Sequence, residues 1–319
     1  MSDENTQWER KLLEKLASEA LVEQRRKRRW GIFFKLIGLA YVGILLASLL
    51  GFATGGPSLE VTRHTALVDL EGVISSDSLA SADRINAGLR AAFESEGSVG
   101  VVLRINSPGG SPVQAGLIND EIKRLRGKYP QKPFYAVVEE ICASGGYYVA
   151  AAADKIYVDK ASLVGSIGVV MNGFGFTGTM EKLGVERRLI TAGENKGFLD
   201  PFSAEDPYQT EFAKQMAEEI HQQFIQVVKE GRGEKLANNP ELFTGLVWTG
   251  AKSVDLGLAD ELGSIDTIAR DVLKAEEILD YTQQDSLAER FAERVGVVFG
   301  QGVRSVFPEF GASQRLGFQ

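Results

Sequence analysis

The residue of this sequence best suited to nucleophilic chemistry is a serine between a run of β-branched and aromatic residues and an alanine-rich stretch. Ser144 lies in segment 134–153, which predicts a strand, a tight Ala-Ser-Gly-Gly turn and a helix. The first turn of a helix offers free N–H groups to an oxyanion, and glycines let a substrate carbonyl approach. The alternative is that Ser144 only caps the helix, and taken alone this is the stronger interpretation.

A base must accept the serine proton before the hydroxyl can act as a nucleophile at neutral pH. The chain has two histidines. His64 precedes the first expected strand, and His221 lies among polar residues of an expected surface helix, so neither is favoured for a Ser-His-Asp triad. A lysine can replace histidine where burial lowers its pKa from about 10.4 toward about 7 to 8. The sequence therefore favours a Ser-Lys pair, although spacing alone does not identify the lysine.

Strands and helices alternate around this serine. Strands are expected at 65–70, 99–105, 134–138, 155–158 and 188–191, and helices at 81–93, 113–126, 206–231, 251–256 and directly after Ser144. Glycine turns such as Asn106–Gly110 stand at the ends of strands. This repetition predicts a mixed α/β layer fold with its site at the strand-to-helix turns.

An apolar run at 30–52 contains one charged residue, Lys35, close to its first end. About 20 apolar residues span a bilayer, and the five cations Arg25–Arg29 before the run predict a cytoplasmic N-terminus. The alternative is a signal peptide cleaved near Ala53. A leader of 29 residues that is acidic and amphipathic favours a retained anchor instead.

Charge and cysteine content exclude other classes. A net charge of −8 and a pI near 5.1 give no support for a nucleic-acid partner, which would require a basic surface. Cys142 is the single cysteine, so the chain cannot form an internal disulfide, and we expect this residue to be a buried filler near the turn.

An ordered set of motifs resembles the bacterial signal peptide peptidase A family. The resemblance covers about residues 60 to 270, and its motifs are Ile105–Gly110, Cys142–Tyr148, Val164–Val169, Ala192–Phe202, Phe243–Gly250 and Gly257–Asp260. That family is similar in fold to Clp-type proteases and crotonases. The resemblance therefore implies an α/β fold of repeated ββα units, here preceded by a single transmembrane helix.

Carried over by motif, the resemblance assigns roles to individual residues. It implies that Ser144 is the acylated nucleophile and that Lys196, in a polar loop that would otherwise be solvated, is the general base. It implies an oxyanion hole formed by the N–H groups of Gly145 and Gly109, the latter ahead of Gly110, and a lysine-orienting hydroxyl on Ser166. Neither a cofactor nor a metal ion is implied.

The resemblance also implies a biological setting. It predicts a single-pass serine endopeptidase of the bacterial cytoplasmic membrane, with its catalytic domain on the periplasmic side, that cuts apolar peptides such as signal peptides left after preprotein processing. It further implies a ring-shaped homo-oligomer, in which serine and lysine can come from adjacent subunits. Two alternatives remain: a related anchored protease acting on other membrane or envelope proteins, and a non-catalytic crotonase-like scaffold in which Ser144 caps a helix.

The predicted organisation has five parts. These are a cytoplasmic amphipathic and basic leader (1–29), a transmembrane anchor (30–52), a linker (53–64), a Ser-Lys peptidase domain (65–275), and a C-terminal tail helix with an extension (276–319).

Overall fold

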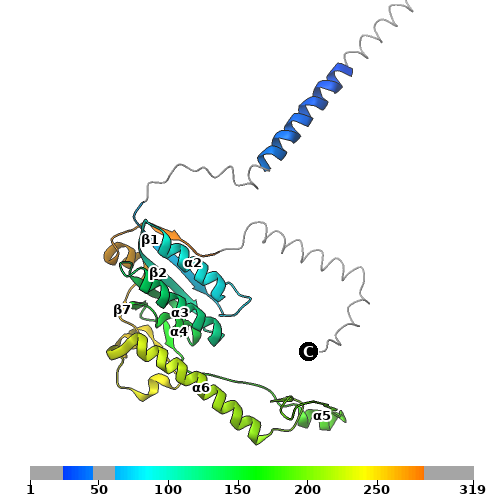
Figure 1. The fold of residues 1–319 in the computed structure, drawn as a ribbon, viewed down its shortest axis with the longest axis vertical. Coiled ribbons are helices and arrows are strands. Elements are labelled where there is room, and N and C mark those ends of the chain that lie inside the picture. The colour runs from blue at the N-terminus through cyan, green and yellow to red at the C-terminus, as the bar shows by residue number, and fades with distance from the viewer. Residues whose placement is uncertain (1–23, 46–61, 284–319) are drawn as a thin grey trace, which may run out of the picture. The chain divides into compact units, whose positions relative to one another are not determined.

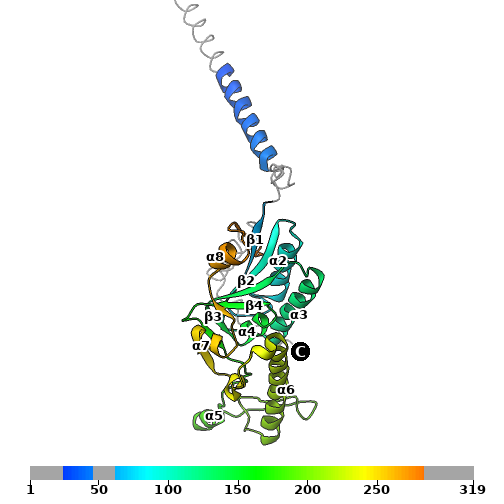
Figure 2. The same cartoon turned by 90° about the vertical axis from the view of Figure 1, so that its left-hand side faces the viewer.

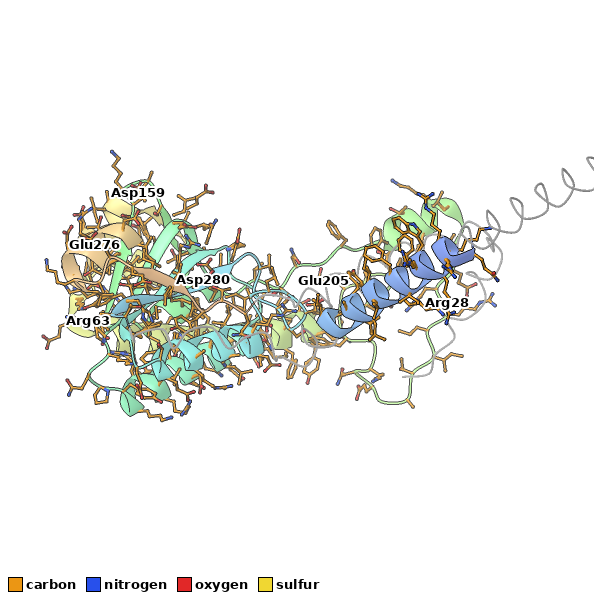
Figure 3. The ribbon with its side chains drawn as sticks, turned by 90° about the horizontal axis from the view of Figure 1, so that it is seen from above. Arg28, Arg63, Asp159, Glu205, Glu276 and Asp280 are labelled. Carbon is orange, nitrogen blue, oxygen red and sulfur yellow. The ribbon has the colours of Figure 1, made fainter. Side chains whose placement is uncertain are left out.

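The computed structural model of this chain describes residues 24–45 and 62–283, which belong to two units divided between Thr62 and Arg63. In the first unit residues 24–45 form a helix whose side chains, Arg28 among them, are exposed (Figure 3). Within the two described ranges no helix has the length and apolar character needed to cross a membrane. The predicted anchor extends to residue 52, and its last part, like residues 1–23 of the leader and 284–319 of the tail, lies outside the described residues.

The second unit is built on a sheet in which the structure describes eight strands. They are β1 (His64–Glu71), β2 (Ser98–Ser107), β3 (Phe134–Ala143), β4 (Lys155–Val158), β5 (Leu163–Gly165), β6 (Val247–Thr249), β7 (Glu261–Leu262) and β8 (Ile278–Asp280). The order is β6-β5-β3-β2-β1-β8, and β4 pairs with β3 and β7. All pairs are parallel except β5 with β6. The predicted α/β class is confirmed, while the likeness to Clp-type proteases and crotonases stays a prediction.

Helices cover both faces of this sheet. Figure 2 shows α2 (Ala82–Glu94) and α3 (Pro112–Lys128) on one side and α8 (Ile265–Thr267) on the other. The remaining helices are α4 (Gly145–Ala150), α5 (Thr177–Leu183), α6 (Pro207–Arg232), α7 (Gly250–Asp255), η1 (Gly233–Lys235), η2 (Pro240–Phe243) and η3 (Ile268–Val272). Because both faces are covered, the central strands read as continuous apolar runs.

Residue alternation along β2 explains how the sheet holds its helices. Leu103 faces the larger core cluster, which includes residues of α2, α3, α4 and α6, whereas Val102 faces a smaller cluster that includes Ile268 of η3. An ion pair fastens α2 to α3: Glu121 accepts hydrogen bonds from Arg124 and from Arg90 of α2. The hydrogen bond from Arg124, supported by Arg90, lowers the pKa of Glu121 to about 2.

Residues 171–206, which we call the arm, contrast with the rest of this unit. They include α5, and most of their side chains are exposed. Figure 1 shows α6 running from the sheet to the arm. The buried residues of α6 lie mostly in its C-terminal half, among them Phe224 and Val228. The strand expected at 188–191 is absent, because ladder hydrogen bonds need a neighbouring strand and no described strand pairs with this segment.

The other predicted elements appear close to their expected positions, with two extensions. β3 continues past Val138 to Ala143, since its last residues pair with β5 rather than with β4. β8 pairs with β1, so this unit reaches at least to Asp280 instead of ending at residue 275.

Candidate active site

The turn between β3 and α4 holds Ser144 in an uncommon backbone conformation, with φ 51° and ψ −122°. Its N–H donates to the Gly165 carbonyl at 2.9 Å, and its carbonyl accepts from the Tyr148 N–H at 3.0 Å. Its hydroxyl makes no capping hydrogen bond to α4. The turn therefore fixes the backbone of Ser144 on both sides and leaves the hydroxyl available.

Positive φ at a non-glycine residue is costly, on the order of 1–3 kcal/mol, and persists only where the surroundings enforce it. A serine on such a sharp strand-to-helix turn presents its Oγ at the end of the sheet, where a substrate can reach it. Because the hydroxyl does not cap α4, helix capping does not account for this serine.

A second turn, Ser107–Gly110, packs directly on the serine turn. A methyl group added at Gly109, where φ is 100°, would lie 2.7 Å from the Ala143 carbonyl oxygen, the Gly145 nitrogen and Ser144 Cβ. Ser107 Oγ donates to the Gly72 carbonyl at 2.6 Å and accepts the Gly109 N–H at 3.1 Å. The two turns thus interlock at a contact that admits no side chain.

These contacts bear on the expected oxyanion donors. The Gly109 N–H is engaged by Ser107 Oγ. Gly110 and Gly145, by contrast, both line the cavity beside Ser144, and their N–H groups have no acceptor among residues 24–45 and 62–283. Of the two predicted donors, Gly145 has an N–H without an acceptor among the described residues, and Gly109 does not. For the second donor the geometry favours Gly110 over Gly109.

The cavity at this turn has a volume of about 530 Å³. Ser144 and Ser166 both line it. Its walls come from the turn before α3, from α4, from the segment after β5, from α6 and from the loop before β6; the apolar side chains among them are Pro108, Pro112, Tyr148, Val169, Val170, Ile220 and Phe224. Such a mixture of apolar walls and a few polar groups is typical of ligand-binding clefts.

Ser166 also has an unusual conformation, with φ 51°. Its N–H donates to the Leu246 carbonyl at 2.8 Å, and the preceding Gly165 has φ 118°. The structure therefore brings Ser144, Gly145 and Ser166, three of the predicted site residues, to one cavity.

Lys196 lies elsewhere. It belongs to the arm, in a turn closed by its N–H donating to the Gly193 carbonyl at 3.1 Å, and its side chain is exposed. It does not line the cavity of its own chain. The single chain thus leaves the proposed general base outside the site.

Neither histidine bonds to Ser144 in the described part of the chain. His64 begins β1 and contacts the Tyr281 hydroxyl at 2.9 Å, whereas the cavity lies where β3 and β5 end. His221 is not the surface residue expected from its polar neighbours: its side chain is 20% exposed, and Nε2 lies 3.2 Å from the Ile167 carbonyl. Its spacing of three and seven residues from the buried Phe224 and Val228 is the signal that places it on the inner face of α6.

Buried polar contacts lie next to α4 and stabilise its position. The Tyr147 hydroxyl donates to the Leu258 carbonyl at 2.7 Å, and near it the fully buried Arg232 donates to Asp260 at 2.8 Å. Burial acts to raise the pKa of Asp260, but hydrogen bonds from Arg232 and Lys235 outweigh it and lower that pKa. Cys142 is buried, which raises the pKa of its thiol, as expected of an inert filler.

Comparisons with known proteins find one peptidase family profile and relatives whose descriptions differ. The profile of peptidase family S49 matches residues 127–279. The chain is 49% identical over 177 residues to a protein of Brucella melitensis described as a Na⁺/H⁺ antiporter NhaA, a match that covers 56% of this chain and 24% of that protein. It is 30% identical over 183 residues to a putative signal peptide peptidase SppA of Enterococcus faecium, covering 57% of this chain and 53% of the relative.

A third relative is matched over more of its length. The chain is 30% identical over 244 residues to the probable protease SohB of Haemophilus influenzae, which covers 75% of this chain and 67% of the relative. The chain thus spans about a quarter of the antiporter protein and about half of the Enterococcus relative.

Proposed function

This chain belongs to peptidase family S49, whose members are serine proteases, and on that premise we propose that it is an endopeptidase that cleaves apolar peptides with Ser144 as nucleophile and Lys196 as general base. The observation that carries the proposal is the serine turn itself. A strained backbone holds a hydroxyl that does not cap α4, beside the N–H groups of Gly145 and Gly110, which have no acceptor among the described residues.

The reaction follows from these groups. The neutral amine of Lys196 accepts the proton of Ser144 Oγ, and the oxygen attacks the peptide carbonyl carbon. The N–H groups of Gly145 and Gly110 receive the negative charge on the carbonyl oxygen, a stabilisation of about 2.7 to 4 kcal/mol for each donor. The ammonium returns the proton to the leaving amine as the C–N bond breaks. Water then attacks the acyl-enzyme, its proton passes to the amine and back to Ser144, and the carboxylic product leaves.

We propose that the lysine reaches the cavity from a neighbouring copy. Two features of the arm support this: Lys196 is exposed and outside its own cavity, and apolar side chains of the arm face solvent, with Ile190 95% and Phe174 82% exposed. Exposed apolar surface of this kind marks protein contacts. A ring of copies would cover it and would also remove water from the amine, which a lysine base requires.

Labelling with a serine-directed phosphonate tests the nucleophile. Wild-type protein should be labelled, and folded Ser144→Ala should not. Absence of labelling of folded wild-type protein would favour the non-catalytic scaffold.

Mixed assemblies test the base. Ser144→Ala and Lys196→Ala should each be inactive, with Lys182→Ala as a matched control for an exposed lysine of the arm. Co-expressed and co-purified through different tags, the two inactive variants should regain part of the activity, because some sites receive an intact serine and an intact lysine. Full activity of Lys196→Ala at every pH would rule out the dyad, and a mixture that stays inactive would place both groups in one chain.

We propose remnant signal peptides as the substrates, and the apolar side chains in the cavity wall, among them Val169, Ile220 and Phe224, support this. The Enterococcus relative carries a description of that kind. Product mapping with a synthetic signal peptide, compared with a folded membrane or envelope protein, separates this proposal from a protease with other substrates. Preferential cleavage of the folded protein would contradict it.

A membrane anchor near the N-terminus is part of the same proposal. Apolar side chains of helix 24–45 are exposed, among them Phe34, Leu39 and Ile44, and such a surface suits lipid. The cations Arg25–Arg29 favour a cytoplasmic N-terminus and a catalytic domain on the periplasmic side. Carbonate extraction of the full chain should leave it in the membrane fraction, and external protease should reach the catalytic domain in spheroplasts. Release by carbonate would contradict the anchor.

A further inference from the structure

The segment Gly165–Ile167 carries Ser166 into the cavity, and besides the strand pairing of Gly165 three hydrogen bonds from three different places hold it. Ser144 N–H donates to the Gly165 carbonyl at 2.9 Å, and Ser166 N–H donates to the Leu246 carbonyl at 2.8 Å. The third bond reaches the Ile167 carbonyl from His221 Nε2, at 3.2 Å. Of the three it is the one made by a side chain, so it is the one that a substitution can remove.

The imidazole of His221 is held in a defined orientation. A carbonyl oxygen only accepts, so Nε2 must carry the proton, and Nδ1 lies 3.9 Å from a carboxylate oxygen of Glu218, one turn earlier on α6. One turn later, Phe224 is buried against the Tyr148 ring at a centroid distance of 5.2 Å. The N–H at Nε2 is present in both the neutral and the charged ring, so protonation does not break this bond.

Ser166 needs such a restraint. Its φ of 51° is strained for a serine, and strain of this kind persists only where contacts enforce it. Glycines stand on both sides of the pair Ser166–Ile167, at positions 165 and 168, and glycine imposes little conformational preference. Without the bond at Ile167, Gly165 and the Ser166 N–H remain held, but Ile167 loses this backbone restraint beside Gly168. The strain at Ser166 can then be relieved by movement on this side.

We propose that His221 is a positioning residue for the hydrolysis: it fixes the backbone at Ile167 and so holds the Ser166 hydroxyl in the cavity beside Ser144. This inference rests on the proposed function, because it concerns the group assigned to orient the lysine amine. Under this proposal α6 both forms a wall of the cavity and positions Ser166.

Three substitutions at this position separate the hydrogen bond from general packing. His221→Leu removes the donor at similar volume. His221→Gln keeps an N–H near the position of Nε2, and His221→Asn offers one that is too short to reach. Gln226→Leu, at an exposed position of α6, is the matched control.

We expect kcat for an apolar fluorogenic peptide to fall about 10- to 100-fold in the Leu and Asn variants, as for other small displacements of catalytic groups. The Gln variant should regain most of this loss, KM should change less than threefold throughout, and the control should match wild type. Wild-type kcat in the Leu variant, or equal losses in Leu, Asn and Gln, would overturn the proposal.

Amide hydrogen exchange tests the same claim without catalysis. Exchange at residues 166–170 should rise in the Leu and Asn variants and stay near wild type in Gln, and equal exchange in all variants would overturn the proposal. If the Leu variant fails to fold, kcat and amide exchange of the Gln variant are compared with those of the Asn variant, and the same outcomes support or overturn the proposal. Should the wild-type protein have no Ser144-dependent activity, the proposed function fails, and exchange alone still decides whether His221 restrains this segment.

Discussion

The substitution Gly109→Ala tests whether the two interlocked turns are what holds Ser144. The new methyl group would lie 2.7 Å from the Ala143 oxygen, the Gly145 nitrogen and Ser144 Cβ. Two of these atoms belong to the backbone and the third to the nucleophile itself, so no flexible side chain can yield. The φ of 100° at this position is strained for alanine.

The magnitude follows from these two effects. Backbone strain costs on the order of 1–3 kcal/mol, and overpacking adds about 1–3 kcal/mol. The sum of about 2–6 kcal/mol corresponds to a fall in Tm of roughly 4 to 24 °C for a domain of this size. The part of the strain that is relieved by moving the serine turn should reduce kcat, by about 100-fold for a displacement near 1 Å.

Gly116→Ala provides the matched control. Gly116 lies within α3, and nothing is within 4 Å of the position that its methyl group would occupy. Helical alanine is more stable than glycine by roughly 0.5–1 kcal/mol, so this variant should melt slightly higher and keep its activity. Thermal unfolding and hydrolysis of an apolar fluorogenic peptide measure both variants. If Gly109→Ala matched Gly116→Ala in Tm and kcat/KM, the interlocking would not be what positions the nucleophile.

Three further substitutions probe the assembly and the fold. Ile190→Glu should lower the mass seen by light scattering and abolish activity, whereas Val272→Glu, at an exposed position of η3 outside the arm, should change neither. An assembly unaffected by Ile190→Glu would show that Ile190 is not part of the contact between copies. Glu121→Gln should lower Tm at pH 7, because the pKa of Glu121 is about 2 in the folded state, against an ordinary value of 4.5, and this difference stabilises the folded protein above about pH 4.5. The stabilisation is lost as pH falls toward 2, so the Tm values of wild type and variant should converge there. A Tm difference that stays constant with pH would refute the ion pair. Asp260→Asn should cost about 3–5 kcal/mol by leaving the buried charge of Arg232 without its partner, and urea unfolding with a loss below 1 kcal/mol would contradict this.

Local patterns were sufficient to predict much of the fold. The strand at Lys155–Val158 appears with its expected bounds, and α2, α3 and α6 begin and end within about two residues of theirs, because apolar periodicity and turn residues act locally. β8 was not predicted as a strand, since its pairing with β1 depends on residues more than 200 positions away. The strand expected at 188–191 was wrong for a related reason: strand propensity needs a partner, and the described chain offers none.

The site was predictable only in part. The order of a strand, Ser144 and two glycines indicated a turn that could present a nucleophile, and in the structure Ser166 lines the same cavity as Ser144. The hydrogen bond from the Gly109 N–H to Ser107 Oγ could not be predicted from the sequence, because it depends on the backbone conformation of one turn. The contact of His221 with Ile167 joins residues far apart in sequence, and polar neighbours concealed the inner face of α6. No local pattern specifies the environment of Lys196, which in the proposed assembly belongs to another copy.

The exposed position of Lys196 on the arm has a consequence for the control of proteolysis. Under the proposed pairing, a solitary copy carries a nucleophile without its base and is harmless to surrounding proteins. Hydrolysis then rises more steeply than in proportion to abundance, since each working centre requires an encounter between copies. Dilution of the copies would then act as a safeguard that needs neither an inhibitor nor a removable propeptide.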